Sequence, residues 1–150
     1  MTKGNLLIID DEILLLEKTS LLLEDIADHV YTASSGIDGI KIFNSNKIHC
    51  IICDINMPNM NGVEVLENIR KINQTVPFIF YTGHGSRELM KAAVKLGAFD
   101  FIDKPNLDGL EEITINGLKL GFNEEINHTD QSSSTNFISE YKKLLSLTNS

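Results

Sequence analysis

Carboxylates stand at two places in the chain, each directly after a short apolar run. The first place is the triplet Asp10-Asp11-Glu12, and the second is Asp54. If the two places meet in the fold, Asp10, Asp11 and Asp54 bring about three negative charges within several ångströms, which is repulsive unless a cation lies among them. Carboxylate oxygens with no histidine or cysteine partner favour Mg²⁺ over zinc or copper.

Magnesium in such a setting commonly serves phosphoryl transfer, because it neutralises charge on the phosphoryl oxygens. One carboxylate can also be the attacking nucleophile, since aspartate side chains form aspartyl phosphates. Lys104 would supply a positive partner, and Thr82 a hydroxyl donor. These residue types therefore predict phosphoryl chemistry centred on a carboxylate.

The elements that position these residues are predicted from hydrophobic patterning. Short apolar runs predict five strands, at Leu6–Ile9, Val30–Ala33, Cys50–Cys53, Phe78–Tyr81 and Phe99–Ile102. Helical spacing predicts five helices, at Ile13–Ile26, Gly36–Phe43, Gly62–Ile72, Ser86–Leu96 and Leu107–Leu120. Strict alternation predicts an α/β fold, a doubly wound parallel sheet with helices on both faces. Ligands of such sheets bind outside the carboxyl ends of the strands, where the polar residues above lie.

The joint pattern resembles the receiver domain of two-component response regulators, across roughly residues 3–120. The motifs that carry the resemblance are Asp10-Asp11, Asp54-Ile55-Asn56-Met57-Pro58 with Gly62, Thr82-Gly83, and Lys104-Pro105. Any one of them is common, whereas their order, strand positions and spacings match together. The resemblance implies a flavodoxin-like, five-stranded parallel sheet of order 2-1-3-4-5, which makes the first and third strands neighbours.

The resemblance also implies a role for each site residue. Asp54 matches the phosphoacceptor, assisted by Lys104 and by Thr82. The Mg²⁺ ligands match Asp11, Asp54, the backbone carbonyl of Asn56, and Asp10 through a water molecule. Thr82 and the aromatic Phe101 match the switch residues that move on activation. Pro105 matches a proline usually preceded by a cis bond, and Asn56 and His84 match positions that influence the dephosphorylation rate.

The function implied is that of a phosphoacceptor signalling protein that assists its own phosphotransfer and dephosphorylation, rather than an enzyme acting on a separate substrate. A histidine kinase or a histidine phosphotransfer protein would supply the phosphoryl group. Phosphorylation would change the partner preference of the face built from the fourth helix, the fifth strand and the fifth helix. We expect a stand-alone receiver that acts by protein–protein interaction or as a phosphorelay intermediate, and the resemblance also allows a phosphorylation-dependent dimer.

Composition narrows the classes of function. The chain has 150 residues, of which 42% are hydrophobic, and a formal net charge of −8. Such an acidic chain repels phosphate backbones, which argues against direct nucleic-acid binding. No apolar run approaches the roughly 20 residues of a membrane span. Three successive acids interrupt the apolar N-terminus, unlike a signal peptide, so we expect a cytoplasmic protein.

The domain division predicted is a receiver over residues 1–120 and a tail over residues 121–150. Residues 121–136 have the composition of a polar linker. Phe137–Leu147 regains a helical pattern with Phe137, Tyr141, Leu144 and Leu145 on one face. Such a helix is too short to be stable alone, so it would need a surface to pack on, in a partner, in a second copy or in this chain. The alternative is a frayed tail with no role of its own.

Plainer interpretations accompany each motif. Asp10 and Asp11 could cap the first helix. Lys104 alone would be a surface charge, and Phe101 alone a core residue. Cys50 and Cys53 have redox or metal-site spacing, but on a strand they point to opposite faces, which favours two buried structural cysteines. Arg70 is expected on the exposed side of its helix. His84 alone would be an exposed loop histidine, and no partner is assigned to His29, His49 or His128.

Three alternatives to a phosphorylated receiver remain at this point. A phosphorylation-independent, receiver-like binding module would keep the fold without the chemistry. A flavodoxin-type redox protein would need donors for a flavin phosphate in the first loop, where this chain has acids. A phosphatase with an aspartyl-phosphate intermediate would place its nucleophile after the first strand, not the third.

Overall fold

The computed structural model describes residues 3–83 and 85–126. It contains one parallel sheet with strand order β2-β1-β3-β4-β5, which confirms the predicted α/β fold and its topology. The strands are β1 (Asn5–Ile9), β2 (His29–Ala33), β3 (Cys50–Cys53), β4 (Phe78–Thr82) and β5 (Asp100–Asp103). For every strand, the two ends together are shifted from the predicted bounds by no more than two residues.

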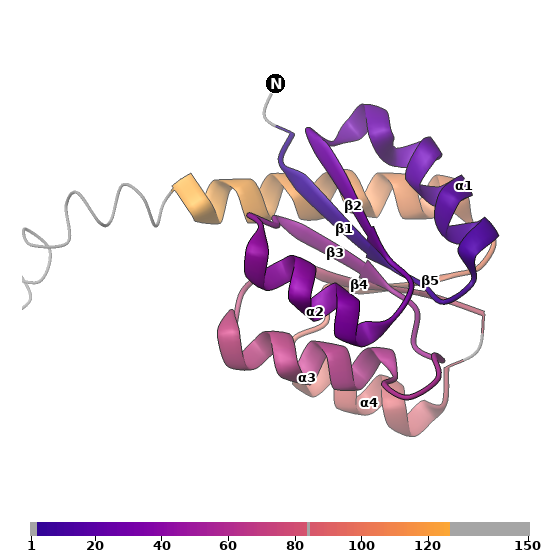
Figure 1. Cartoon of the computed structure of the whole chain (residues 1–150). Helices are drawn as coiled ribbons and strands as arrows, with labels where there is room; N and C mark the ends of the chain where they lie inside the picture. The colour runs from indigo at the N-terminus through magenta and orange to yellow at the C-terminus, as the bar shows by residue number, and fades with distance from the viewer. Residues whose placement is uncertain (1–2, 84, 127–150) are drawn as a thin grey trace, which may run out of the picture.

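The helices cover both faces of the sheet (Figure 1). Helix α1 (Ile13–Leu23) and a C-terminal helix over residues 107–126 lie on one face. On the other face lie α2 (Gly36–Ser45), α3 (Gly62–Ile72) and α4 (Arg87–Lys95). The predicted helix Ile13–Ile26 is divided, because its last three residues, Glu24–Ile26, form the 3₁₀ turn η1.

Two separate hydrophobic clusters form the core, one on each face of the sheet. Alternate residues of the strands enter each cluster, because successive side chains of a strand point to opposite faces. Cys53 belongs to the cluster under α2, α3 and α4, and Cys50 to the cluster under α1 and the C-terminal helix. Both thiols are free and buried, which confirms the interpretation of two structural cysteines.

Local sequence explains where several helices begin. Asn61 and Glu64 form a reciprocal capping box at the start of α3, and Ser35 and Ser86 accept hydrogen bonds from the backbone at the starts of α2 and α4. In contrast, α1 has Glu12 at its N-cap and no side-chain cap hydrogen bond. The Asp10 carboxylate instead accepts from the backbone N–H of the N-cap residue itself, Glu12, at 3.0 Å.

The C-terminal helix is longer than predicted, because it continues through residue 126 instead of ending at Leu120. Gly121 is buried, and a β-carbon on it would collide with the carbonyl oxygen of His49. The glycine that suggested a linker is thus a point of close packing between the helix and the loop before β3. The rest of the predicted linker and the segment Phe137–Leu147 lie outside the described residues.

None of the helices within residues 3–83 and 85–126 is long and apolar enough to cross a membrane.

Candidate functional site

The carboxyl ends of β1 and β3 place two acids side by side. Ile9 and Cys53 are register partners at the ends of these neighbouring strands, and each is followed by an aspartate. The Asp54 N–H donates to the Ile9 carbonyl at 3.0 Å, which continues the ladder by one residue. Asp10 and Asp54 are both about 5% exposed or less, so the sheet carries two nearly buried carboxyl groups at its edge.

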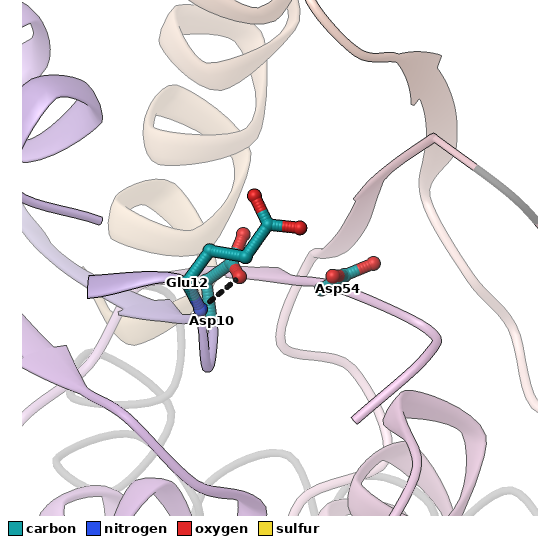
Figure 2. A group of neighbouring side chains, drawn as sticks. All are labelled: Asp10, Glu12 and Asp54. Atoms are coloured by element: carbon teal, nitrogen blue, oxygen red, sulfur yellow. Dashed lines mark hydrogen bonds between the residues drawn. The ribbon is translucent and has the colours of Figure 1, made fainter. Parts of the chain in front are cut away.

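A third carboxylate joins this pair. Single oxygens of Asp10, Glu12 and Asp54 lie within 4.8 Å of one another (Figure 2). Asp10 Oδ1 accepts a hydrogen bond of 3.0 Å from the Glu12 N–H, which holds the Glu12 backbone beside the Asp10 side chain. Glu12 differs from the other two in being exposed, so it forms the rim of the group.

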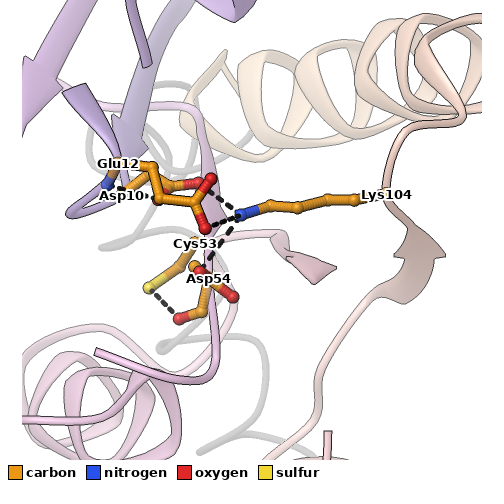
Figure 3. Close-up of polar contacts among 5 residues, drawn as sticks. All are labelled: Asp10, Glu12, Cys53, Asp54 and Lys104. Atoms are coloured by element: carbon orange, nitrogen blue, oxygen red, sulfur yellow. Dashed lines mark hydrogen bonds and ion pairs between the residues drawn. The ribbon is translucent and has the colours of Figure 1, made fainter. Parts of the chain in front are cut away.

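Lys104 directly follows β5, the edge strand, and its side chain extends past β4 to this acidic group. Its ammonium donates to Asp10 Oδ2 at 2.8 Å and to Asp54 Oδ2 at 3.1 Å, and it lies 4.0 Å from Glu12 Oε1 (Figure 3). The Lys104 N–H also donates to the Thr82 carbonyl at 3.0 Å, so the end of β4 fixes the lysine backbone. The bond between Lys104 and Pro105 is cis, as the resemblance implied.

The environment shifts two of these pKa values. Burial raises the pKa of Asp10, against the hydrogen bonds from Lys104 and from the Glu12 N–H that lower it. For Lys104, burial acts to lower the pKa, but the hydrogen bond to Asp10 and the negative charges of Asp10 and Asp54 together raise it. Lys104 is therefore held as a cation between the two aspartates.

The donor set fits a hard divalent cation. Three carboxylates face one ammonium, so the fully ionised group keeps an excess of negative charge. Asp54 Oδ1 is buried and has no hydrogen-bond partner among the described residues, a costly state that a cation or another electrophile would relieve. Oxygen-only donors are those that Mg²⁺ prefers.

Asp11 and Asn56 are the two predicted cation ligands that the structure does not place in this group. The three neighbouring carboxylates include Glu12 and not Asp11. Asn56 lies in the loop after β3 and is exposed. The ligand roles of both residues stay predictions, and His84 lies outside the described residues.

The two predicted switch residues occupy neighbouring strands. Thr82 ends β4 and is 5% exposed, and Phe101 lies in β5. The Phe101 ring stacks on Phe80, with centroids 5.4 Å apart and an interplanar angle of 16°. Phe101 is half-buried and also lines a groove of about 720 Å³ along α4, so it belongs partly to the core and partly to the surface.

Two polar residues outside this site have structural roles that the sequence did not reveal. Arg70, expected on the exposed side of α3, is half-buried and donates to the carbonyls of Leu96, Gly97, Val76 and Asn73 at 2.7 to 3.3 Å. His49 is buried; its Nδ1 accepts from the Asn5 N–H at 2.8 Å, and its Nε2 contacts Glu125. Helical periodicity alone cannot identify a long side chain that bends back onto distant carbonyls.

Comparisons with known proteins agree with this geometry. A family model described as the response regulator receiver domain matches residues 6–114. The transcriptional regulatory protein GlrR of Escherichia coli is 36% identical over 102 residues, which is 68% of this chain and 23% of that protein. The response regulator protein TodT of Pseudomonas putida is 35% identical over 98 residues, which is 65% of this chain and 43% of that protein.

Solved structures give the same result. A response regulator receiver domain protein from Clostridium thermocellum matches with a TM-score of 0.70 and 37% identity, over 81% of this chain and 96% of that one. A CheY-like receiver domain protein from Methanospirillum hungatei matches with a TM-score of 0.76 and 28% identity, over 81% and 98%. The chain spans about a quarter to a half of the length of the curated relatives named above. This chain therefore belongs to the response regulator receiver domain family, whose members are signalling proteins of two-component systems.

Proposed function

We propose that Asp54 of this chain accepts a phosphoryl group from a phosphohistidine donor, with Mg²⁺ bound at the acidic group. The observation that carries this proposal is the asymmetry of the Asp54 carboxylate. Its Oδ2 is held by Lys104 at 3.1 Å, while its buried Oδ1 has no hydrogen-bond partner within residues 3–83 and 85–126. A carboxylate in this state is oriented and poorly solvated, which suits a nucleophile.

Asp10, Asp54 and Asp11, with the Asn56 carbonyl, would hold the cation, and Glu12 stands at the rim of the same group. A bound Mg²⁺ would neutralise charge on the phosphoryl oxygens as they approach the carboxylates. The excess of carboxylates over ammonium groups supports this ligand set. Asp10, held by Lys104 and by the Glu12 N–H, keeps its orientation without the cation.

In the transfer step, a carboxylate oxygen of Asp54 attacks phosphorus in line with the bond that breaks. A P–O bond forms, the P–N bond to the donor imidazole breaks, and its electron pair stays on the imidazole nitrogen. Lys104 offsets the charge of the phosphoryl oxygens, and the Thr82 hydroxyl donates to one of them. The aspartyl phosphate adds up to about two negative charges and three strong acceptor oxygens.

Phosphorylation then acts on the surface through Thr82 and Phe101. Movement of the Thr82 side chain toward the phosphoryl group would leave space that Phe101 fills by turning inward from its place against Phe80. Phe101 lines the groove along α4 with Met90, Val94 and three basic residues, so its rotation would reshape that groove. This is a two-state element biased by a local change of charge.

We infer that the partners are proteins: a histidine kinase or phosphotransfer protein as donor, and a target that reads the face of α4, β5 and the C-terminal helix. The groove on this face supports a protein target, because its apolar floor is edged by Arg87, Lys91 and Lys95. Action as a stand-alone receiver or a phosphorelay intermediate, and a phosphorylation-dependent dimer, belong to the same proposal.

Intact-protein mass spectrometry tests the proposal. Incubation with acetyl phosphate and Mg²⁺ should give one phosphoryl adduct, which is absent without Mg²⁺ and absent in Asp54→Asn. Asp54→Asn keeps the size of the side chain and removes the nucleophilic charge, so a folded variant is a matched control. An adduct of equal yield in Asp54→Asn would contradict the proposal. No adduct on a folded protein, even from a phosphorylated phosphotransfer protein, would favour a phosphorylation-independent binding module.

A further inference from the structure

Helix α1 presents an apolar ridge to solvent. Leu14 and Leu21 are 83% and 68% exposed, and they lie seven residues apart, so they align along the helix. The buried residues of α1 are Leu16, Thr19 and Leu23, which lie on the opposite side of the helix. The ridge therefore faces solvent, away from the core. At these positions the leucine side chains contribute little burial free energy to folding.

The ridge is broad and continues to the acidic site. Ile13 and Leu22 flank it and are 58% and 40% exposed. A shallow groove at its beginning is lined by Leu14, Leu15 and Ile13 and bounded by Glu12 and Lys18. A contiguous set of exposed large aliphatic side chains of this kind marks an interaction surface rather than ordinary surface.

The last described residues of the chain lie at the same edge of the sheet as the end of α1. Glu125 contacts His49, whose Nδ1 accepts from the N–H of Asn5, the first residue of β1. At the same edge, the Asp28 N–H, just after α1 and η1, donates to the Gly4 carbonyl at 2.8 Å. Figure 1 shows α1 and the C-terminal helix on the same face of the sheet.

Ten residues, 127–136, separate the last described residue from the next apolar segment, and fully extended they span at most about 33–36 Å. The next segment, Phe137–Leu147, has 11 residues, as α1 does. Its apolar residues Phe137, Tyr141, Leu144 and Leu145 are spaced so that they would share one face of a helix. As a helix it would present an apolar stripe of the same length as the α1 ridge.

Charge distinguishes the surroundings of the α1 ridge from those of the apolar groove along α4. Residues 13–26 carry three acids and one lysine, whereas α4 carries three bases and one acid. The segment Phe137–Leu147 carries Lys142, Lys143 and one glutamate. Its net positive charge is attracted to the surroundings of the α1 ridge and repelled by those of the α4 groove.

We propose that Phe137–Leu147 folds as a short helix on the α1 ridge of its own chain. The ridge begins at Ile13, directly after Glu12, and runs to Leu22 near the end of α1.

Hydrogen–deuterium exchange of the full chain at short labelling times tests the docking itself, without phosphoryl chemistry. Peptides covering residues 137–147 should exchange about tenfold or more slowly in the wild type than in Leu14→Asp or Leu21→Asp. Val94→Asp, which changes a 63% exposed residue of α4, is the matched control and should keep the protection. Both ridge residues are exposed, so their substitution removes little core packing; protection of the β1 and β3 peptides reports that the fold is kept.

Leu145→Asp gives the reciprocal variant, and it should abolish the same protection from the tail side. The protection should be equal at low and high protein concentration, because the contact is within one chain. Three results would overturn the proposal: no protection in the wild type, protection lost in Val94→Asp but not in Leu14→Asp, or protection that grows with concentration. The last result would assign the ridge to a second copy of the chain. None of these results bears on whether Asp54 is phosphorylated.

Discussion

Gly62 packs directly against the backbone of Asp54. A β-carbon on Gly62 would collide with the Asp54 carbonyl oxygen and would lie 2.9 Å from the Phe80 ring. The Gly62 N–H also donates to the Ile55 carbonyl at 2.8 Å, which closes the loop after β3. The loop that carries the proposed phosphoacceptor therefore depends on a residue without a side chain at the start of α3.

Gly62→Ala should accordingly destabilise the protein by about 1–3 kcal/mol, because either the Asp54 backbone or α3 must move. Urea unfolding followed by circular dichroism measures the change. Gly83→Ala is the control and should change the free energy of unfolding by less than about 0.5 kcal/mol, since no atom of the described residues, its chain neighbours aside, lies within 4 Å of a β-carbon there. Equal stabilities of the two variants would contradict the role given to Gly62.

Arg70→Lys should cost about 1–3 kcal/mol of stability, although it conserves the charge. The guanidinium joins α3 to the carbonyls of Leu96 and Gly97 before β5, as well as to those of Val76 and Asn73, and an ammonium cannot reproduce this fork. Thermal unfolding checks the prediction. Lys71→Gln, at the exposed neighbouring position, should be close to neutral, and a neutral Arg70→Lys would show that these hydrogen bonds contribute little.

Tyr81→Phe should leave stability unchanged or raise it by up to about 1 kcal/mol. The Tyr81 side chain is 2% exposed and its hydroxyl has no hydrogen-bond partner in the part of the chain that the structure describes, so the substitution removes a desolvated polar group and breaks no bond there. The contact of Lys104 with the ring, at 5.9 Å from its centroid, is retained by phenylalanine. Chemical unfolding measures the effect, and a loss above about 1 kcal/mol would imply a hydroxyl partner.

Glu125 gives the protein a pH-dependent contribution to stability. The hydrogen bond with His49, assisted by Lys47, lowers the pKa of Glu125. A depressed carboxyl pKa stabilises the fold above the unfolded value of 4.5 and loses that effect as pH falls through the folded pKa. Glu125→Gln should therefore lower the melting temperature at pH 7, by about 2–4 °C, and the difference from wild type should shrink as pH falls below about 4.5. A difference independent of pH would contradict this account.

The fold could be predicted from the sequence because its main signals are local. The buried strand Cys50–Cys53 and the helix Gly62–Ile72 have the predicted bounds, since an all-apolar run and a 3.6-residue period each define their element without tertiary information. The end of the C-terminal helix could not be predicted this way. Gly121 begins a polar stretch, and only the position of His49 shows that this glycine is packed inside a helix.

The site shows the same division. Asp10, Asp54 and Lys104 come together because each directly follows a strand of the same parallel sheet. The strand order and register bring the carboxyl ends of these strands close to one another. The membership of Glu12 depends on the hydrogen bond that its backbone N–H donates to the Asp10 carboxylate, which no spacing rule indicates. The structural roles of Arg70 and His49 could not be predicted for a similar reason. Arg70 donates to the distant backbone carbonyl of Leu96, and His49 contacts the Asn5 N–H and the Glu125 side chain.

The central claim is that Asp54 is the residue that becomes phosphorylated, and chemical mapping tests it most directly. The protein is incubated with acetyl phosphate and Mg²⁺ and then treated with borohydride, which reduces an aspartyl phosphate to homoserine, before peptide mass spectrometry. We predict homoserine at position 54 alone, in the sample with Mg²⁺ and not in the sample without it. Homoserine at another aspartate, such as Asp10 or Asp11, or labelling that persists in Asp54→Asn, would contradict the account.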